Sequence, residues 1–546
     1  MTNPVSRFRF ARRAVLAAAA LALTACSWLV PQGEAPDPQL AKDWPTDTLN
    51  RGEREAGRAA SELHWRDYFV APELVSLIDT ALQSNRDLRL ALLRVEEARA
   101  AYGIQRAGQF PAIGLGAQGA RSRVPGDLNA SGRSVVGSDY EAYVGLNSWE
   151  LDLWGRVRSL KDAALQEYLA TEAAQRAARV SLIAAVANAW LGLRELDERI
   201  ALARQTIATR EEAQRIFRRR NEVGSASTLE LTQVETLLNH ARTLETQLQQ
   251  ARAAQAHALT LLLGAPLELP PAADAHLRED GVFAPVRVGL PAELLTARPD
   301  ILAAERRLAA AQANIRAARA AFFPRIALTG SFGTASAQLD GLFASGSRAW
   351  TFAPTISLPI FDGGLRRASL DLAEVRSDLA VASYERTVQI AFREVADALS
   401  SRQWLTRQVA IQQQSLATQT QRARLAQLRY EHGATTYLEV LDAQRDLLEA
   451  QQQSVQVRRS LLSSHIALYT ALGGAAAADS VTGGAIQPAT STPCGERDDL
   501  FRIAEENSAH RRGAACRRPA RVRLDEVRAA GAGRRLRERQ RAYRSH

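Results

Sequence analysis

An internal duplication constrains this 546-residue sequence more than any other feature. Short matches recur at a spacing of 209 positions: Leu-Glu at 229–230 and 438–439, and Leu-Gly at 263–264 and 472–473. Further upstream the spacing becomes 213, as between Pro111 and Pro324. Self-similarity at a fixed spacing indicates a repeated structural unit. The length therefore predicts two copies of one unit, rather than three or four unrelated domains.

Each copy begins with a helical stretch and continues with two strand-like segments. The helical stretches are Ser84–Gln109 and Pro299–Phe323, each followed by a proline that ends it. The strand-like segments are 112–121, 140–151, 325–334 and 349–360. In the last of these, large apolar residues alternate with small or polar ones. This pattern is typical of an outer-membrane strand and also of a strand in a soluble sandwich. Four strands cannot close a barrel, which needs about eight.

Two long helices complete each copy. Residues 156–222 and 365–431 contain 67 residues each and no proline. At 1.5 Å per residue, each helix would extend about 100 Å. Their partners, 226–263 and 435–472, have 38 residues each. Alanine, leucine, glutamine, arginine and glutamate dominate, as in coiled coils. The helices are charged throughout, so they are not predicted to cross a membrane.

The net charge of +10 belongs to the two ends of the chain. Residues 1–25 carry four arginines and no acid, and residues 475–546 carry fifteen arginines and nine acids. The remaining 26–474 hold 50 cations and 50 anions. Nucleic-acid binding requires positive charge on the folded part, so we expect no nucleic-acid partner. Residues 475–546, the arginine-rich tail, include few apolar residues and are predicted to be disordered.

The N-terminal end has the pattern of a targeting segment. After the arginines, Ala14–Ala25 is apolar but too short for a membrane-spanning helix of about 20 residues. A basic region, an apolar region and a small-residue exit predict a signal peptide over 1–25. The exit, Leu-Thr-Ala-Cys at 23–26, resembles a bacterial lipobox, which predicts lipidation of Cys26. An ordinary signal peptide followed by a chance cysteine is the alternative.

No motif predicts an enzyme. The G-x-G-x-x-G match at 114–119 lies inside an alternating strand, and no helix opens after it, which disfavours dinucleotide binding. G-x-S-x-G, Walker, H-E-x-x-H and C-x-x-C patterns are absent from the sequence. We therefore expect no catalytic residues, no cofactor and no metal site.

Together these features resemble the TolC-like outer-membrane efflux proteins, or outer-membrane factors, and within them the lipidated OprM/NodT-type branch. The matching segments are the lipobox, Ser148–Arg156, Ala297–Ile301, Phe322–Pro324, Leu358–Gly364 and Tyr437–Gln444. They occur in the family's order and cover residues 26–474.

The resemblance implies an α+β membrane protein with a homotrimeric architecture. Each chain would give four strands to a 12-stranded outer-membrane β-barrel, which continues into a periplasmic barrel of long coiled-coil helices. The expected organisation is a signal peptide (1–25), an N-terminal linker and equatorial segment (26–71), a first repeat (72–264), a linker (265–290), a second repeat (291–474) and the arginine-rich tail (475–546).

The implied function is that of a passive exit duct for small molecules in a tripartite efflux system. The chain would be anchored in outer-membrane lipid through acylated Cys26 and would extend into the periplasm. Its partners would be a periplasmic adaptor and an inner-membrane pump, of the RND type. A duct for type I protein secretion is one alternative. A structural coiled-coil envelope lipoprotein is another, although the alternating strands argue against it.

A duct requires a gate, and the reversals at Gly224 and Gly433 are the natural place, because glycine tolerates positive φ. By resemblance, Glu439 and Asp442 would project into the lumen as carboxylate rings, which select cations. Leu438 would form an apolar constriction, and Arg445 would bridge to a neighbouring helix. Tyr430 resembles a family tyrosine that bonds across to the first repeat, here to Glu230. Ordinary coiled-coil surface positions are the alternative.

The turns themselves are small and polar, as a tip-to-tip contact with an adaptor requires. The residues expected to touch the adaptor are Val223, Gly224, Ser225, His432, Gly433 and Ala434.

Overall fold

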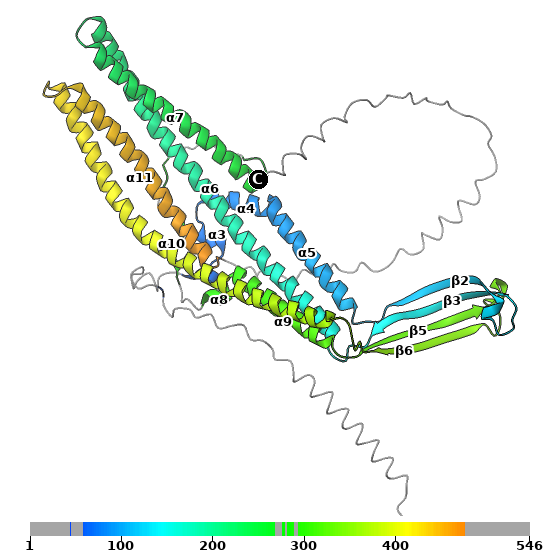
Figure 1. Ribbon diagram of the computed structural model, residues 1–546. Helices are drawn as coiled ribbons and strands as arrows, with labels where there is room; N and C mark the ends of the chain where they lie inside the picture. Colours follow the sequence, from blue (N-terminus) through cyan, green and yellow to red (C-terminus); the bar gives the residue numbers. More distant parts are fainter. Residues whose placement is uncertain (1–43, 45–57, 268–275, 279–280, 289–292, 475–546) are drawn as a thin grey trace, which may run out of the picture. The chain divides into compact units, whose positions relative to one another are not determined.

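The computed structural model describes residues 44, 58–267, 276–278, 281–288 and 293–474 (Figure 1). The predicted signal peptide, Cys26 and the tail lie outside these residues. The first copy consists of α4 (Pro72–Ser84), α5 (Arg86–Ala107), β2 (Ile113–Val124), β3 (Val135–Glu150), α6 (Arg156–Glu222) and α7 (Thr228–Leu263). The second consists of α8 (Leu294–Ala297), α9 (Pro299–Ala320), β5 (Arg325–Ser336), β6 (Arg348–Ser357), α10 (Leu365–Glu431) and α11 (Tyr437–Ala471).

The long helices α6 and α10 have the predicted bounds and contain 67 residues each. Each begins after a glycine with positive φ, Gly155 (76°) and Gly364 (89°). Their return helices α7 and α11 begin two residues later than predicted. The reason is that Ser227 and Thr436 have extended backbones and serve as the N-caps.

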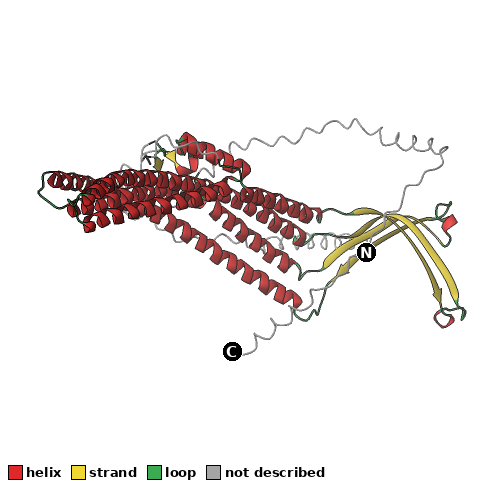
Figure 2. Ribbon diagram, turned by 90° about the horizontal axis from the view of Figure 1, so that it is seen from above, coloured by secondary structure: helices red, strands yellow, loops and turns green. Residues whose placement is uncertain are grey.

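The four strands form one antiparallel sheet (Figure 2), in the order β2-β3-β5-β6 that the labels of Figure 1 follow. β2 and β3 are longer than predicted, because they remain paired up to Val124 and Val135. Pro125 then ends β2, and the one-turn helix η3 (Gly126–Leu128) follows. β6 ends at Ser357, two residues before Pro359, which has no amide hydrogen for a strand ladder.

The strand register confirms the alternation predicted for the sheet. A row of mutually paired residues on one face consists of Leu115, Val144, Phe332 and Trp350. The adjacent row, on the opposite face, consists of Gly114, Gly145, Ser331 and Thr351. One face is therefore apolar and the other small or polar. The glycine-rich stretch 114–119 lies within β2, in agreement with its interpretation as strand rather than nucleotide loop.

In each copy the long helix and its return helix form a hairpin, α6 with α7 and α10 with α11. The return helix ends against the helix that leads to the sheet. The Asn85 side-chain amide donates to the Leu262 carbonyl (2.8 Å), which connects α5 to α7. At the equivalent place, Arg298 Nη1 donates to the Ala471 carbonyl (2.9 Å), which connects α9 to α11. Asn85 and Arg298 are related by the 213 spacing, and the two carbonyls by the 209 spacing. The duplication therefore repeats a joint as well as the elements.

The main hydrophobic core forms where short α3 (Trp65–Tyr68) and α4 pack on the long helices. Tyr68 stacks on Tyr469 of α11 with ring centroids 4.1 Å apart, and its hydroxyl donates to the His465 carbonyl (2.8 Å). Near this core, β1 (Arg58–Ala59) pairs in parallel with β4 (Val286–Arg287). Trp44 joins the same core and lies against Phe392 of α10, with ring centroids 4.6 Å apart.

Towards the sheet, the helices pack in the same order as the strands. α6 contacts α5 and α9, and α9 also contacts α10. Among the described residues, no helix combines the length and the apolar character of a membrane-crossing segment.

Candidate gate at the hairpin tips

Both hairpins reverse through the same kind of turn. Gly224 has φ 76° and Gly433 has φ 70°, which confirms the predicted left-handed reversals. The Ser225 amide donates to the Arg220 carbonyl (2.7 Å), and the Ala434 amide donates to the Arg429 carbonyl (2.8 Å). All six residues expected at the adaptor contact are exposed. The tips are therefore open surfaces at the ends of α6 and α10.

The equivalent glutamates after the two turns have different partners. At the first tip, Glu230 accepts from the Ser227 amide (2.8 Å), and the Ser227 hydroxyl accepts from the Glu230 amide (3.2 Å). The backbone and hydroxyl hydrogen bonds from Ser227 lower the pKa of Glu230. At the second tip, Glu439 accepts from Arg429 Nη1 (2.8 Å) and from the Thr435 hydroxyl.

Close to the tips, all four hairpin helices meet in a small apolar cluster. Its buried members are Phe217, Val234, Ala426, Tyr437, Val440, Leu441 and Ala443. The Phe217 ring of α6 lies 4.4 Å from the Tyr437 ring of α11, between centroids. The Tyr430 ring of α10 meets Tyr437 edge-on at 4.9 Å. This tip cluster joins the first hairpin to the second.

Tyr430 does cross to the first repeat, but to a different residue from the one predicted. Arg220 Nη1 of α6 donates to the Tyr430 hydroxyl, and the same guanidinium lies 5.3 Å from the centroid of the Phe217 ring. Within one chain, the Glu230 carboxylate accepts from Ser227 rather than from Tyr430, and the predicted bond between Tyr430 and Glu230 stays a prediction. Sequence reasoning missed Arg220. Arginine also stands at 218 and 219, and nothing in the pattern distinguishes the three.

The predicted luminal residues lie together on the first turns of α11, and Leu438 is 47% exposed. Arg445 pairs with two acids of its own helix, Asp442 (3.4 Å) and Asp446 (3.1 Å). Within one chain, the predicted bridge from Arg445 to a neighbouring helix is therefore not formed. Asp446 makes that link instead, since it accepts from Arg422 of α10 (2.5 Å). The bonds from Arg422 and Arg445 lower the pKa of Asp446.

A polar clamp provides a second attachment between the hairpins, further from the tips. Glu198 of α6 and Arg458 of α11 are both buried and form an ion pair of 2.5 Å. The backbone of Leu277, in the linker between the repeats, completes the pair. Its amide donates to Glu198 (2.8 Å), and its carbonyl accepts from Arg458 (2.9 Å). The Arg199 side chain also donates to Gln452 (2.8 Å).

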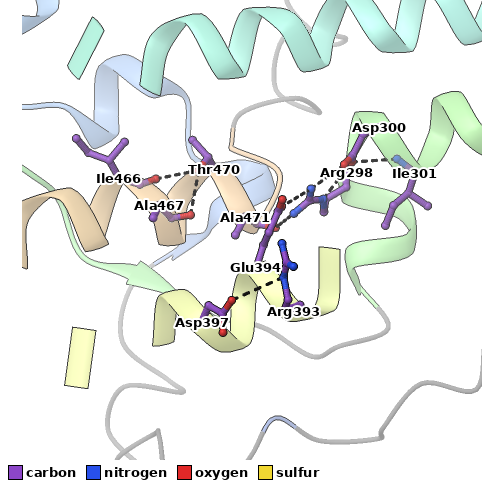
Figure 3. Close-up of polar contacts among 10 residues, drawn as sticks. All are labelled: Arg298, Asp300, Ile301, Arg393, Glu394, Asp397, Ile466, Ala467, Thr470 and Ala471. Atoms are coloured by element: carbon purple, nitrogen blue, oxygen red, sulfur yellow. Dashed lines mark hydrogen bonds and ion pairs between the residues drawn. The ribbon is translucent and has the colours of Figure 1, made fainter. Parts of the chain in front are cut away.

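Two of the segments that resemble the family, Ala297–Ile301 and Ser148–Arg156, join elements of the fold at a distance from the tips. Arg298 binds Asp300 through two hydrogen bonds (3.0 and 2.7 Å) and pairs with Glu394 of α10 at 2.8 Å (Figure 3). At the junction of β3 and α6, Glu150 accepts two hydrogen bonds from Arg156 (2.8 and 2.7 Å).

Within the described parts of the chain, no group of three histidine, cysteine or acidic residues is arranged to hold a metal ion. The contacts described at this site are ion pairs, hydrogen bonds and aromatic packing between helices.

Comparison with known proteins agrees with this architecture. The family model described as "Outer membrane efflux protein" matches residues 77–265 and 290–474. The antibiotic efflux pump outer membrane protein ArpC of Pseudomonas putida is 42% identical over 459 residues, 84% of this chain and 94% of that protein. Outer membrane protein OprJ of Pseudomonas aeruginosa is 44% identical, over 83% of this chain and 94% of that protein.

A solved structure shows the same fold. The open state of the MtrE outer membrane channel of Neisseria gonorrhoeae is 38% identical and superposes with a TM-score of 0.73. The match covers 82% of this chain and 98% of that chain. MtrE is an outer membrane channel, and the family is one of channels rather than enzymes. The chain therefore belongs to the outer membrane efflux protein family.

Proposed function

We propose that this outer-membrane efflux channel is a homotrimeric, passive exit duct for small molecules, gated at its periplasmic hairpin tips. It operates with a periplasmic adaptor and an inner-membrane pump of the RND type. The chain itself is not an enzyme. The observation that carries the proposal is the sheet of four strands. Within the described residues its two outer edges are unpaired, and β3 and β6 lead into helices of about 100 Å.

The unpaired edges support assembly with further copies of the chain. β2 and β6 each have one neighbour in the sheet, so each exposes a row of free amides and carbonyls. In lipid such groups must be paired, which requires closure of the barrel. Pairing β6 of one copy with β2 of the next continues the antiparallel order, and three copies give twelve strands.

The helices next to these edges also have unpartnered apolar faces. Leu365, Leu372 and Leu379 of α10 are 68%, 50% and 65% exposed and stand seven residues apart. On α5, Leu90, Leu93 and Ile104 are exposed on one face. Seven-residue spacing of leucine is the pattern by which helices pack in coiled coils. These faces support contact between α10 of one subunit and α5 of the next.

Gating at the tips is supported by the charges near the start of α11. Glu439 and Asp442 are three residues apart and partly exposed, so they share a helix face. In a trimer each becomes a ring of three carboxylates, which attracts cations and repels itself. The closed arrangement then depends on Arg429 and Arg445, which neutralise these carboxylates, and on the tip cluster. The exposed residues of the two turns are the surface for the adaptor.

Lipid attachment at Cys26 is compatible with the position of Trp44. Eighteen residues separate Cys26 from Trp44, and such a length can extend at most about 65 Å. Phe392, which contacts Trp44, lies 27 residues into α10, about 40 Å from its start at the sheet. A lipid anchor in the membrane around the barrel is therefore within reach.

A drug-susceptibility profile of the deletion strain tests the proposed function. Deletion is expected to sensitise the cells to several small toxic compounds, and the intact gene on a plasmid is expected to restore resistance. Unchanged susceptibility together with loss of a secreted protein would instead support the type I secretion alternative.

A further inference from the structure

Arg210 of α6 is a buried arginine with unsatisfied hydrogen-bonding groups. It lies 12 residues before the end of α6, about 18 Å from the tip, and it is 3% exposed. Its Nη1 donates to the Leu237 carbonyl of α7 (2.5 Å). Among the described residues, Nε and Nη2 have no hydrogen-bond partner. The side chain is thus largely removed from water with only one of its three nitrogens satisfied.

Two other arginines of the described chain are buried to a similar degree, and both are paired with acids. Arg298 is 7% exposed and binds Asp300 and Glu394. Arg458 is 8% exposed and binds Glu198. Arg210 is the most buried of the three, yet no ion pair with a carboxylate is formed by it within the described residues.

The surroundings of Arg210 do not replace the missing carboxylate. Within the described chain, the phenol of Tyr437, on α11, is the ionisable group that acts on the charge of Arg210. Burial, assisted by the neighbouring Tyr430, raises the pKa of Tyr437 to about 12, so this phenol is neutral at physiological pH. Burial correspondingly lowers the pKa of Arg210, although arginine remains charged.

The two hairpins differ at this position, and the first of them carries the buried arginine. The 209 spacing places Gln419 at the equivalent position of α10, and Gln419 is half-buried and uncharged. The fold therefore does not require a cation at this position, since the second hairpin is built without one.

We propose that Arg210 is a gating residue whose unpaired, buried guanidinium destabilises the closed contact between the two hairpins and so favours their separation. When the hairpins separate, water reaches Nε and Nη2 and restores the hydration that the packed arrangement withholds. An unpaired buried charge is strongly destabilising, whereas an apolar residue of similar size at such a place is often neutral or stabilising. This inference rests on the proposed gating at the tips.

Single-channel recording of the full chain in planar bilayers tests the role of Arg210. Arg210→Met and Arg210→Gln are expected to lower the open probability at least about fivefold, and Arg210→Met to raise the thermal stability of the assembly. The glutamine variant reproduces the residue of the second hairpin, and it decides the question if the methionine variant does not assemble. Arg215→Met is the control, because Arg215 is on the same helix but exposed and paired with Glu212.

A third variant separates this inference from the proposed gate. Tyr430→Phe removes the acceptor of Arg220 and is expected to raise the open probability if the tips form the gate. If Tyr430→Phe acts while both Arg210 variants match the wild type or open more often, the role of Arg210 is overturned and the gate stands. If none of the variants changes the open probability, the tip gate is overturned together with the role of Arg210.

Discussion

At the residue scale, the two tips use equivalent glutamates for different purposes. Glu230 closes a reciprocal cap with Ser227 and so fixes the first turn of α7. Glu439 is neutralised by Arg429, and the Thr436 side chain makes no cap hydrogen bond at the start of α11. The first tip is therefore capped by two side chains that bond to the backbone of its own helix start, whereas the second tip depends on an ion pair that a change of charge can release.

Replacing the two cap residues separates these roles. Ser227→Ala is expected to weaken the start of α7 by about 0.5–2 kcal/mol, because the capping hydrogen bond is lost. Hydrogen exchange followed by mass spectrometry would show faster exchange at residues 228–231. Thr436→Ala is the matched control, since no side-chain cap is lost there. Equal acceleration at both tips would contradict the assigned caps.

The cap also has a defined dependence on pH. Because the pKa of Glu230 is lowered in the folded chain, its contribution is present above the ordinary glutamate pKa. It is lost as the pH falls through the lowered folded value. Protection of the first turn of α7 should therefore persist across neutral pH and decrease only in acid. A decrease that begins well above the ordinary glutamate pKa would contradict the assignment.

Helical spacing alone put Glu439 and Asp442 on one face of the helix that follows the second turn. The proposed roles of Leu438, Glu439 and Asp442 at the gate came from the resemblance to the family. Sequence reasoning did not identify Arg220 as a partner of Tyr430. Three consecutive arginines at 218–220 are chemically equal, and only the approach of α10 to α6 selects Arg220. Arg210 was not singled out either, since burial of a charge without a partner has no sequence pattern.

At the element scale, the joints between helices explain why glycine recurs at the end of each hairpin. Gly264 has φ 66°, and a Cβ at this position would collide with the Ser84 carbonyl at the end of α4. At Gly473, with φ 93°, a Cβ would lie 2.8 Å from the Ala297 carbonyl. Both the turn and the close approach of the next helix therefore exclude a side chain.

Gly264→Ala is expected to destabilise the folded chain by more than about 1 kcal/mol, because it combines a strained φ with a steric clash. The apparent melting temperature of the purified protein measures the effect. Gly103→Ala is the control. Gly103 is exposed near the C-terminal end of α5 with nothing near its Cβ position, and alanine there should stabilise the helix by up to about 0.5–1 kcal/mol. Similar shifts in both variants would contradict the close-packed joint.

The bounds of α6 and α10 could be predicted because long proline-free segments lie between repeated glycines. The break between α4 and α5 at Asn85 could not be predicted from the sequence. The predicted helix from Ser84 begins where α4 ends, and Asn85 becomes extended in order to cap α5 and reach Leu262. That contact joins residues 177 positions apart, so local sequence carries no signal for it.

At the scale of the whole molecule, strands and helices follow one another in the same order, with β2 and α5 at one end and β6 and α10 at the other. The pattern of the duplication predicted this plan, because each copy contributes one strand hairpin and one helical hairpin. The sequence alone predicted the need for further copies from the strand count. The edges that would meet became identifiable only from the strand order.

Leu372→Glu is expected to prevent trimer formation, because it places charges on the apolar face of α10 that is proposed to contact α5 of the next subunit. Native mass spectrometry in detergent would then detect monomers in place of trimers. Leu372→Met keeps the face apolar and should leave the trimer intact. Trimers of normal stability in the glutamate variant would show that this face is not the interface.

Carboxylates near the second tip are proposed to guard the closed duct, and planar-bilayer conductance of a double variant measures their effect. Glu439→Ala with Asp442→Ala removes both proposed rings and the partner of Arg429. We expect a higher single-channel conductance than that of the wild type, and relief of the block by divalent cations. Unchanged conductance with an unchanged divalent block would contradict it.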